Sequence, residues 1–186
     1  MSYMFFWNEA FNWDISKWNT WNVTNMEWMF SNTRFNQPIW DWNVSHVTNM
    51  ADMFSFNLVF NQNIWSWNVS NVTTMNRMFS REWQRTIVWA AYSMWANPIF
   101  NNWWSDSIKN WDISSATDMS YMFYWNNVFN QPIWSWNTSN VQEMEYIFWW
   151  CPDNICWMQQ DLNWWDLSWL TRCDSRTFWD IINAHC

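Results

Sequence analysis

At 186 residues, the chain is long enough for one domain, and half of its residues are hydrophobic, which is enough for a continuous core. Its formal net charge of −8 makes it a poor partner for nucleic acid, whose phosphates are bound by Lys and Arg, and for anionic lipid. No run approaches the ~18 consecutive apolar residues of a membrane helix, so we expect no membrane span in this chain.

A block of the form F-N-x-x-I-x-x-W-N-V-S-x-V-T-x-M-x-x-M-F recurs along the sequence. Its copies occupy residues 11–30, 35–54, 60–79, 100–123 and 129–148. Most steps between their M-F pairs are 24 or 25 residues, inside the range of about 20–29 residues that is typical of leucine-rich repeats. The period predicts one supersecondary unit stacked many times.

The second copy shows what one unit should form. Trp42 and Val44 are two residues apart, so a short strand would place both on one face. Thr48 and Asn49 then offer capping side chains before Met50, and residues 50, 53 and 54 recur with the spacing of a helical turn. We therefore expect each coil to carry a short strand followed by a short helical turn.

These patterns predict an α/β fold, a right-handed leucine-rich-repeat-like solenoid of about seven coils with short parallel strands and short helical turns. Residues 1–150 should form the repeat solenoid, with a degenerate coil around residues 80–99, and residues 151–186 a degenerate repeat or C-terminal cap. Neighbouring strands or rings should lie ~4.7–4.9 Å apart along the stack. The expected structural core is one interior column of Trp18, Trp42, Trp67, Trp111 and Trp136 and a second of Met29, Met53, Met78 and Met122.

Nothing in the sequence spells out a reaction. The four cysteines, Cys151, Cys156, Cys173 and Cys186, lack the spacing of a zinc or redox site, and neither His46 nor His185 completes one. They are interpreted as buried thiols of a cap, or as one or two disulfides if the protein is exported. We expect no catalytic residues, no cofactor and no metal, and hence no enzyme.

Several stretches carry a family resemblance. Residues 35–39 and 129–133 both read F-N-Q-P-I, and residues 67–73 read W-N-V-S-N-V-T. These blocks resemble the BspA-like leucine-rich repeat surface proteins over roughly residues 1 to 150. The resemblance implies a cell-surface or extracellular location, although the start of this chain has no signal-peptide pattern. It also implies a non-enzymatic binding or adhesion module whose partner is a protein or glycan on another cell or in the matrix, with a structural spacer or a self-associating rod as the alternative.

One departure from that family is systematic, because tryptophan stands where the family has glycine. The chain has 25 tryptophans and no glycine, and only six tryptophans occupy the repeat's own W-N or W-D position. We call the other 19 the surplus tryptophans. Our hypothesis is that most of them are glycines rewritten as tryptophan. One route is a gene from a lineage that reads UGA as glycine, translated with a genetic code that reads UGA as tryptophan. The other is deliberate replacement. Surplus tryptophans at corners, such as Trp40, Trp65 and Trp134, should then be exposed, with backbone angles that glycine would relieve. The rival interpretation, sugar stacking on Trp103, Trp104, Trp149 and Trp150, loses its basis if these are glycines.

Overall fold

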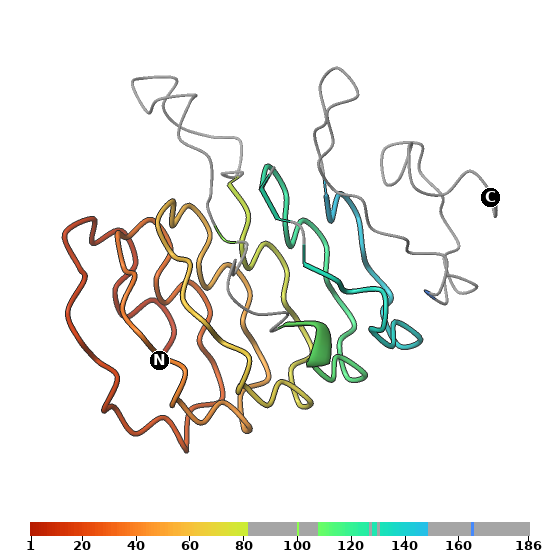
Figure 1. Ribbon diagram of the computed structural model, residues 1–186, viewed down its shortest axis with the longest axis horizontal. Coiled ribbons are helices and arrows are strands. Elements are labelled where there is room, and N and C mark those ends of the chain that lie inside the picture. The colour runs from red at the N-terminus through yellow and green to blue at the C-terminus, as the bar shows by residue number, and fades with distance from the viewer. Residues whose placement is uncertain (82–99, 101–107, 127, 130, 149–164, 166–186) are drawn as a thin grey trace.

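The chain folds into a stack of coils, seen here in a computed structural model that describes residues 1–81, 100, 108–126, 128–129, 131–148 and 165. Figure 1 shows the coils side by side, from the red N-terminal coil to the cyan coil around residue 140. Residues bond to partners about one repeat further along the chain: the Tyr3 amide donates to the Glu27 carbonyl, and the Met26 amide to the Asn49 carbonyl, each at 2.9 Å. The repeat length in the sequence therefore corresponds to one turn of the stack.

The expected α/β architecture of strands and helical turns is wrong. The only helix in the described part of the chain is a single 3-10 turn, η1, Ile108–Asn110, and no sheet is present there. In place of strands, isolated parallel bridges join Asn25 to Asn49, Asn49 to Thr74, Thr74 to Asp118 and Asp118 to Glu143. Each coil therefore pairs with the next through irregular backbone.

Turns replace the strand expected around Trp42 and Val44. The Trp42 amide donates to the Ile39 carbonyl at 3.2 Å, and the Val47 amide donates to the Val44 carbonyl at 2.9 Å. Such bonds between residues three apart close tight turns, which are incompatible with a continuous extended strand. Trp42 and Val44 therefore point inward because one turn ends at Trp42 and the next begins at Val44.

The helical turn expected over residues 50–54 is replaced by bonds to the following coil. Amides of Met50, Asp52 and Phe54 donate to the carbonyls of Thr74, Asn76 and Met78 at 2.8–3.0 Å. The backbone of Asp52 has φ of 55°, in the left-handed region that a right-handed helix excludes. Bonding between coils thus consumes the amides that a helix would have used internally.

The third and fourth described coils are direct neighbours although they are far apart in sequence. The amides of Met75, Arg77 and Phe79 donate to the carbonyls of Asp118, Ser120 and Met122 at 2.9–3.0 Å. The degenerate coil expected around residues 80–99 and the cap expected at 151–186 lie almost entirely outside the described residues.

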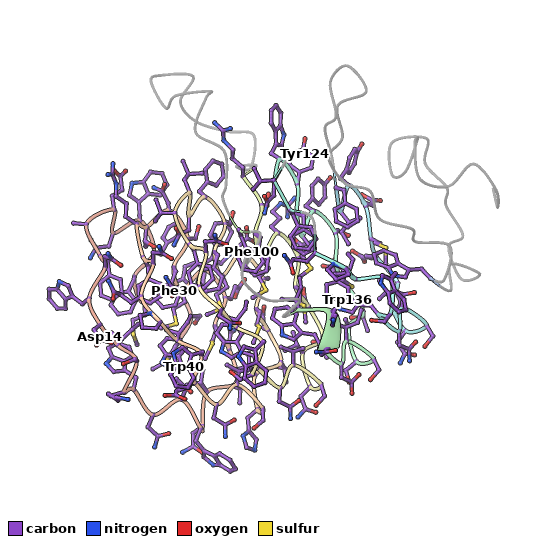
Figure 2. All side chains as sticks on the ribbon, in the orientation of Figure 1. Asp14, Phe30, Trp40, Phe100, Tyr124 and Trp136 are labelled. Atoms are coloured by element: carbon purple, nitrogen blue, oxygen red, sulfur yellow. The ribbon has the colours of Figure 1, made fainter. Side chains whose placement is uncertain are left out.

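Paired phenylalanine rings run through the interior of the stack. Within one coil, Phe54 and Phe60 stack with centroids 3.8 Å apart, and between coils Phe54 lies 5.7 Å from Phe79. Figure 2 shows Phe30 and Phe100 among these interior rings. The spacing between rings of adjacent coils is wider than the expected ~4.7–4.9 Å, since offset stacking moves the centroids apart. The between-coil pairs are Phe5–Phe30, Phe30–Phe54, Phe54–Phe79, Phe79–Phe123 and Phe123–Phe148.

From Trp42 onward, the repeat tryptophan of each coil donates a hydrogen bond to the coil before it. The indole Nε1 of Trp42 donates to the Ile15 carbonyl at 3.1 Å, and that of Trp136 donates to the Ile108 carbonyl at 2.8 Å. The ring is buried while its one polar atom is satisfied, as a core tryptophan requires. The same bond is made by Trp67 to Ile39, Trp111 to Ile64 and Trp165 to Ile133.

The remaining members of the expected core columns divide into two groups. The side chains of Met29, Met53, Met78 and Met122 are fully buried, with 0% exposed. Trp18 differs from its four counterparts because 37% of its surface is exposed. It lies in the first coil, where its indole covers Phe5 at a centroid distance of 5.7 Å.

The contrast between Trp42 and Trp18 gives a stability test. Replacing Trp42 by Ala should lower the free energy of unfolding by about 3–5 kcal/mol, because a buried ring and its hydrogen bond are both lost. The matched substitution Trp18→Ala should cost about 1 kcal/mol or less, since that ring is partly exposed already. Urea unfolding of both variants beside the parent measures the difference, and equal losses would contradict the assignment.

Candidate binding face

The outward residues of each coil recur with the same period as the core. On one face, which we call the threonine row, the side chains of Thr24, Thr48, Thr73 and Thr117 follow one another along the stack. Each lies directly after an inward-facing position, occupied for example by the fully buried Val47 and Val72. The threonine row is therefore the outer surface of the segment that bridges the coils.

Hydrogen bonds hold the threonine row in a regular arrangement. The hydroxyls of Thr48, Thr73 and Thr117 each donate to the threonine carbonyl of the preceding coil, at 3.0–3.2 Å. The amides of the same residues donate to the same carbonyls at 2.8–2.9 Å. These three side chains thus have fixed rotamers, while their oxygen lone pairs remain able to accept hydrogen bonds.

The residue two positions before the row differs between coils, and in the last described coil Asn140 precedes Gln142, which stands where the other coils have threonine. Asn71 Nδ2 donates to the Ser45 carbonyl, and Asn140 Nδ2 donates to the Ser114 carbonyl, both at 2.7 Å. The same place in the second coil is taken by His46, whose ring meets the Trp21 ring edge-on at 4.6 Å. Chemical variety between coils is therefore concentrated beside a row that hardly varies.

A second line of side chains, which we call the left-handed column, consists of Tyr3, Trp28, Asp52, Arg77, Tyr121 and Tyr146, all with φ between 52° and 60°. Tyr3 and Trp28 stack at 6.1 Å, and Tyr121 and Tyr146 stack at 5.1 Å. The guanidinium of Arg77 lies 4.4 Å from the centre of the Tyr121 ring, a cation–π contact. The column places one acid and one base between two aromatic pairs.

Asp52 is the titratable group with the strongest perturbation in this column. Its side chain is 5% exposed, and burial raises the pKa of the carboxyl from 3.8 to about 7, against the opposing attraction of Arg77. Within the described residues, Asp52 Oδ1 and Arg77 Nε are buried without a hydrogen bond. A buried carboxyl that lacks a complete set of partners favours its neutral form.

In the described part of the chain, no three His, Cys, Asp or Glu side chains gather closely enough to hold a metal ion. Asp14 and Asp112 accept hydrogen bonds within their own turns, Asp14 from the amide and hydroxyl of Ser16 and Asp112 from the hydroxyl and amide of Ser114, and these bonds lower the pKa of both carboxyls. All four cysteines, and the four tryptophans considered for sugar stacking, lie outside the described residues.

The sequence reasoning missed the left-handed column. Its members have no common chemistry, so their residue types do not mark the position. The signal that could have located it is their place in the repeat, because each member stands two residues after the methionine that opens the M-x-x-M-F segment.

The buried carboxyl predicts an unusual pH dependence. Between about pH 4 and 7 the folded chain holds a proton on Asp52 that the unfolded chain has released, so stability falls as the pH rises through this window. The free energy of unfolding should drop by up to about 4 kcal/mol between pH 4 and 8 from this group. Asp52→Asn, which also tolerates positive φ, should abolish the slope and raise stability at pH 8.

Thermal unfolding across this pH range provides the measurement. Asp14→Asn is the control, because that carboxyl is exposed and its pKa is shifted in the opposite direction. An unchanged slope in Asp52→Asn would show that Asp52 is charged in the folded state.

No helix among the described residues is long and apolar enough to cross a membrane. No curated protein and no solved structure matches the chain. A family profile does match, over residues 1–93 and again over residues 81–180, and it is described as "Mycoplasma protein of unknown function, DUF285". This family is found in surface repeat proteins. The stacked repeats and the two matches, which together cover nearly the whole chain, place this protein in the DUF285 family.

Proposed function

We propose that this chain is a non-enzymatic binding module that presents the threonine row to another macromolecule, a protein or a glycan on another cell or in the surrounding matrix. The observation that carries the proposal is the row itself, in which the hydroxyls of Thr48, Thr73 and Thr117 make the same hydrogen bond to the preceding coil. A rigid, repeated surface can bind an extended partner at several equivalent points, and this increases affinity without any single strong contact.

The net charge of the chain restricts the classes of macromolecule that it can bind. The net charge of −8 opposes polyanions, so neutral polysaccharides and neutral or basic protein surfaces are the classes that suit this chain. The location that the proposal requires is the cell surface or the extracellular space, in keeping with a family found in surface repeat proteins. The finer affinity with BspA-like leucine-rich repeat proteins is also part of this proposal, on the strength of the F-N-Q-P-I and W-N-V-S blocks.

A structural spacer or self-associating rod is the second candidate, and one observation favours it. Hydroxyls of the threonine row and amides of Asn71 and Asn140 are already bonded to the neighbouring coil. Side chains used in this way stabilise the stack itself, as polar side chains commonly do in irregular backbone. In that case the regularity of the face serves assembly of the coils and needs no ligand.

Charge substitution on the threonine row separates the two candidates. The variant Thr48→Glu/Thr73→Glu should weaken binding to a panel of immobilised neutral glycans and matrix proteins by at least about 10-fold, or about 1.4 kcal/mol. The control Trp40→Glu/Trp65→Glu adds the same charge at exposed corners and should leave binding within about twofold. Both variants must first show a cooperative unfolding transition.

Absence of binding by the parent, or equal loss in the two variants, would contradict the proposed binding face. Sedimentation equilibrium then tests the alternative. A self-associating rod gains mass as its concentration rises, and a spacer remains monomeric.

A further inference from the structure

We propose that the natural residue at the surplus tryptophans is glycine, and that Trp7, Trp28 and Trp125 are the positions where the backbone was shaped by it. The composition, with 25 tryptophans and no glycine, suggests that glycine has been replaced by tryptophan, and the backbone of these three residues assigns that replacement to particular sites. It is independent of the proposed binding function.

Burial separates the repeat tryptophans from the surplus ones, except for Trp18, which is 37% exposed in the first coil. Repeat tryptophans such as Trp42, Trp67 and Trp136 are 3% exposed. Every surplus tryptophan that the structure describes is at least partly exposed, although indole is among the most favourable side chains to bury. These are Trp7, Trp13, Trp21, Trp28, Trp40, Trp65, Trp125 and Trp134. Phenylalanine, another large apolar residue, differs from the surplus tryptophans in that most of its described side chains are buried. The surplus tryptophans therefore occupy places where no large apolar side chain was needed.

Backbone geometry identifies the strongest cases. Trp7, Trp28 and Trp125 have φ of 65°, 57° and 60°. For a residue with a Cβ atom the left-handed region costs about 1–2 kcal/mol, whereas glycine enters it freely. The three rings are partly or largely exposed, and their ring contacts are with aromatic side chains at or near the surface, such as Tyr3 beside Trp28, so tryptophan gains less there than it would in the core.

The stack imposes this geometry on whichever residue is present. The Trp7 amide donates to the Ser31 carbonyl and the Trp28 amide donates to the Ala51 carbonyl, both at 3.0 Å. The same bond is made at the corresponding places by Asp52 and Arg77, which also have positive φ. Because the conformation is set by bonding between coils, only a change of residue can relieve the strain.

The corner positions behave differently from what their sequence suggests. Trp40, Trp65 and Trp134 are exposed by 50%, 58% and 50%, as expected, but their φ angles are not positive. The expectation of glycine-like backbone angles is therefore wrong at these three corners. Glycine there would remove exposed apolar surface without relieving the backbone, which makes the three corners a matched control.

If the surplus tryptophans are glycines, the exposed indoles are not a platform for stacking sugars or apolar partners. The threonine row contains no tryptophan, so its chemistry is the same under either reading.

Peptide mass spectrometry on the protein from cells that carry the gene tests the identity directly. Peptides spanning residues 7, 28 and 125 should have the mass for glycine, and the codons there should be UGA. Tryptophan in those peptides, or a UGG codon at these positions, would overturn the proposal.

Thermal unfolding tests the physical basis with the sequence as given. Trp7→Gly/Trp28→Gly/Trp125→Gly should raise Tm by roughly 2–6 °C, after the entropy penalty of glycine is subtracted from the relieved strain. The triple alanine variant at the same positions should raise it less, because alanine retains the Cβ. The control Trp40→Gly/Trp65→Gly/Trp134→Gly should show no such rise. A fall in Tm for the first variant, or equal shifts in the two glycine variants, would contradict the assignment.

Discussion

Registration of each coil on the next is the constraint on which the rest of this structure depends. Backbone amides in one coil donate to carbonyls in the next, as from Phe54 to Met78, while the phenylalanine rings of the same coils stack in parallel. The two interactions require the same offset along the chain, and this offset is the 24- or 25-residue period of the sequence. A shift of one residue would break the hydrogen bonds and the ring stacking at once, so these two interactions together fix the length of the repeat.

This registration explains the strained positions. Pairing with the next coil takes the amide of every second residue in the M-x-x-M-F segment, and the chain meets this demand by placing residues such as Asp52 in the left-handed region. Strain of about 1–2 kcal/mol at each such position must be offset by the packed interior. Buried methionine and phenylalanine supply that offset, at about 25 cal/mol for each Å² of apolar surface removed from water.

Polar side chains accept hydrogen bonds from the backbone amides that the irregular backbone leaves without a backbone partner. Asn49 accepts the Ala51 amide with its Oδ1, and Asn43 does the same for the Ser45 amide. Strands and helices satisfy these groups through their own regular bonding, whereas this fold depends on side chains one or two residues away. The abundance of Asn, Ser and Thr in the repeat is therefore first a structural requirement, and only the outward members are free for a partner.

Sequence reasoning located what repeats but misjudged the local structure that fills each repeat. The period and the inward positions of Trp42, Val44 and Met53 could be read because burial leaves a residue pattern. The strand and the helix were wrong since the same apolar spacing also fits tight turns joined by bonds between coils. Exposure of Trp18 depends on its place in the first coil of the stack, and the raised pKa of Asp52 depends on its burial. Neither is visible in the spacing of residues.

Energetic coupling between rings of adjacent coils tests the central claim most directly. A double-mutant cycle of Phe54→Leu and Phe79→Leu should give a coupling of about 0.5–1.5 kcal/mol, because these rings stack at 5.7 Å. The matched cycle of Phe30→Leu and Phe79→Leu, two coils apart, should lie within about 0.5 kcal/mol of zero. Equal coupling in both cycles, or none in the first, would contradict a stack held in register by contacts between neighbouring coils.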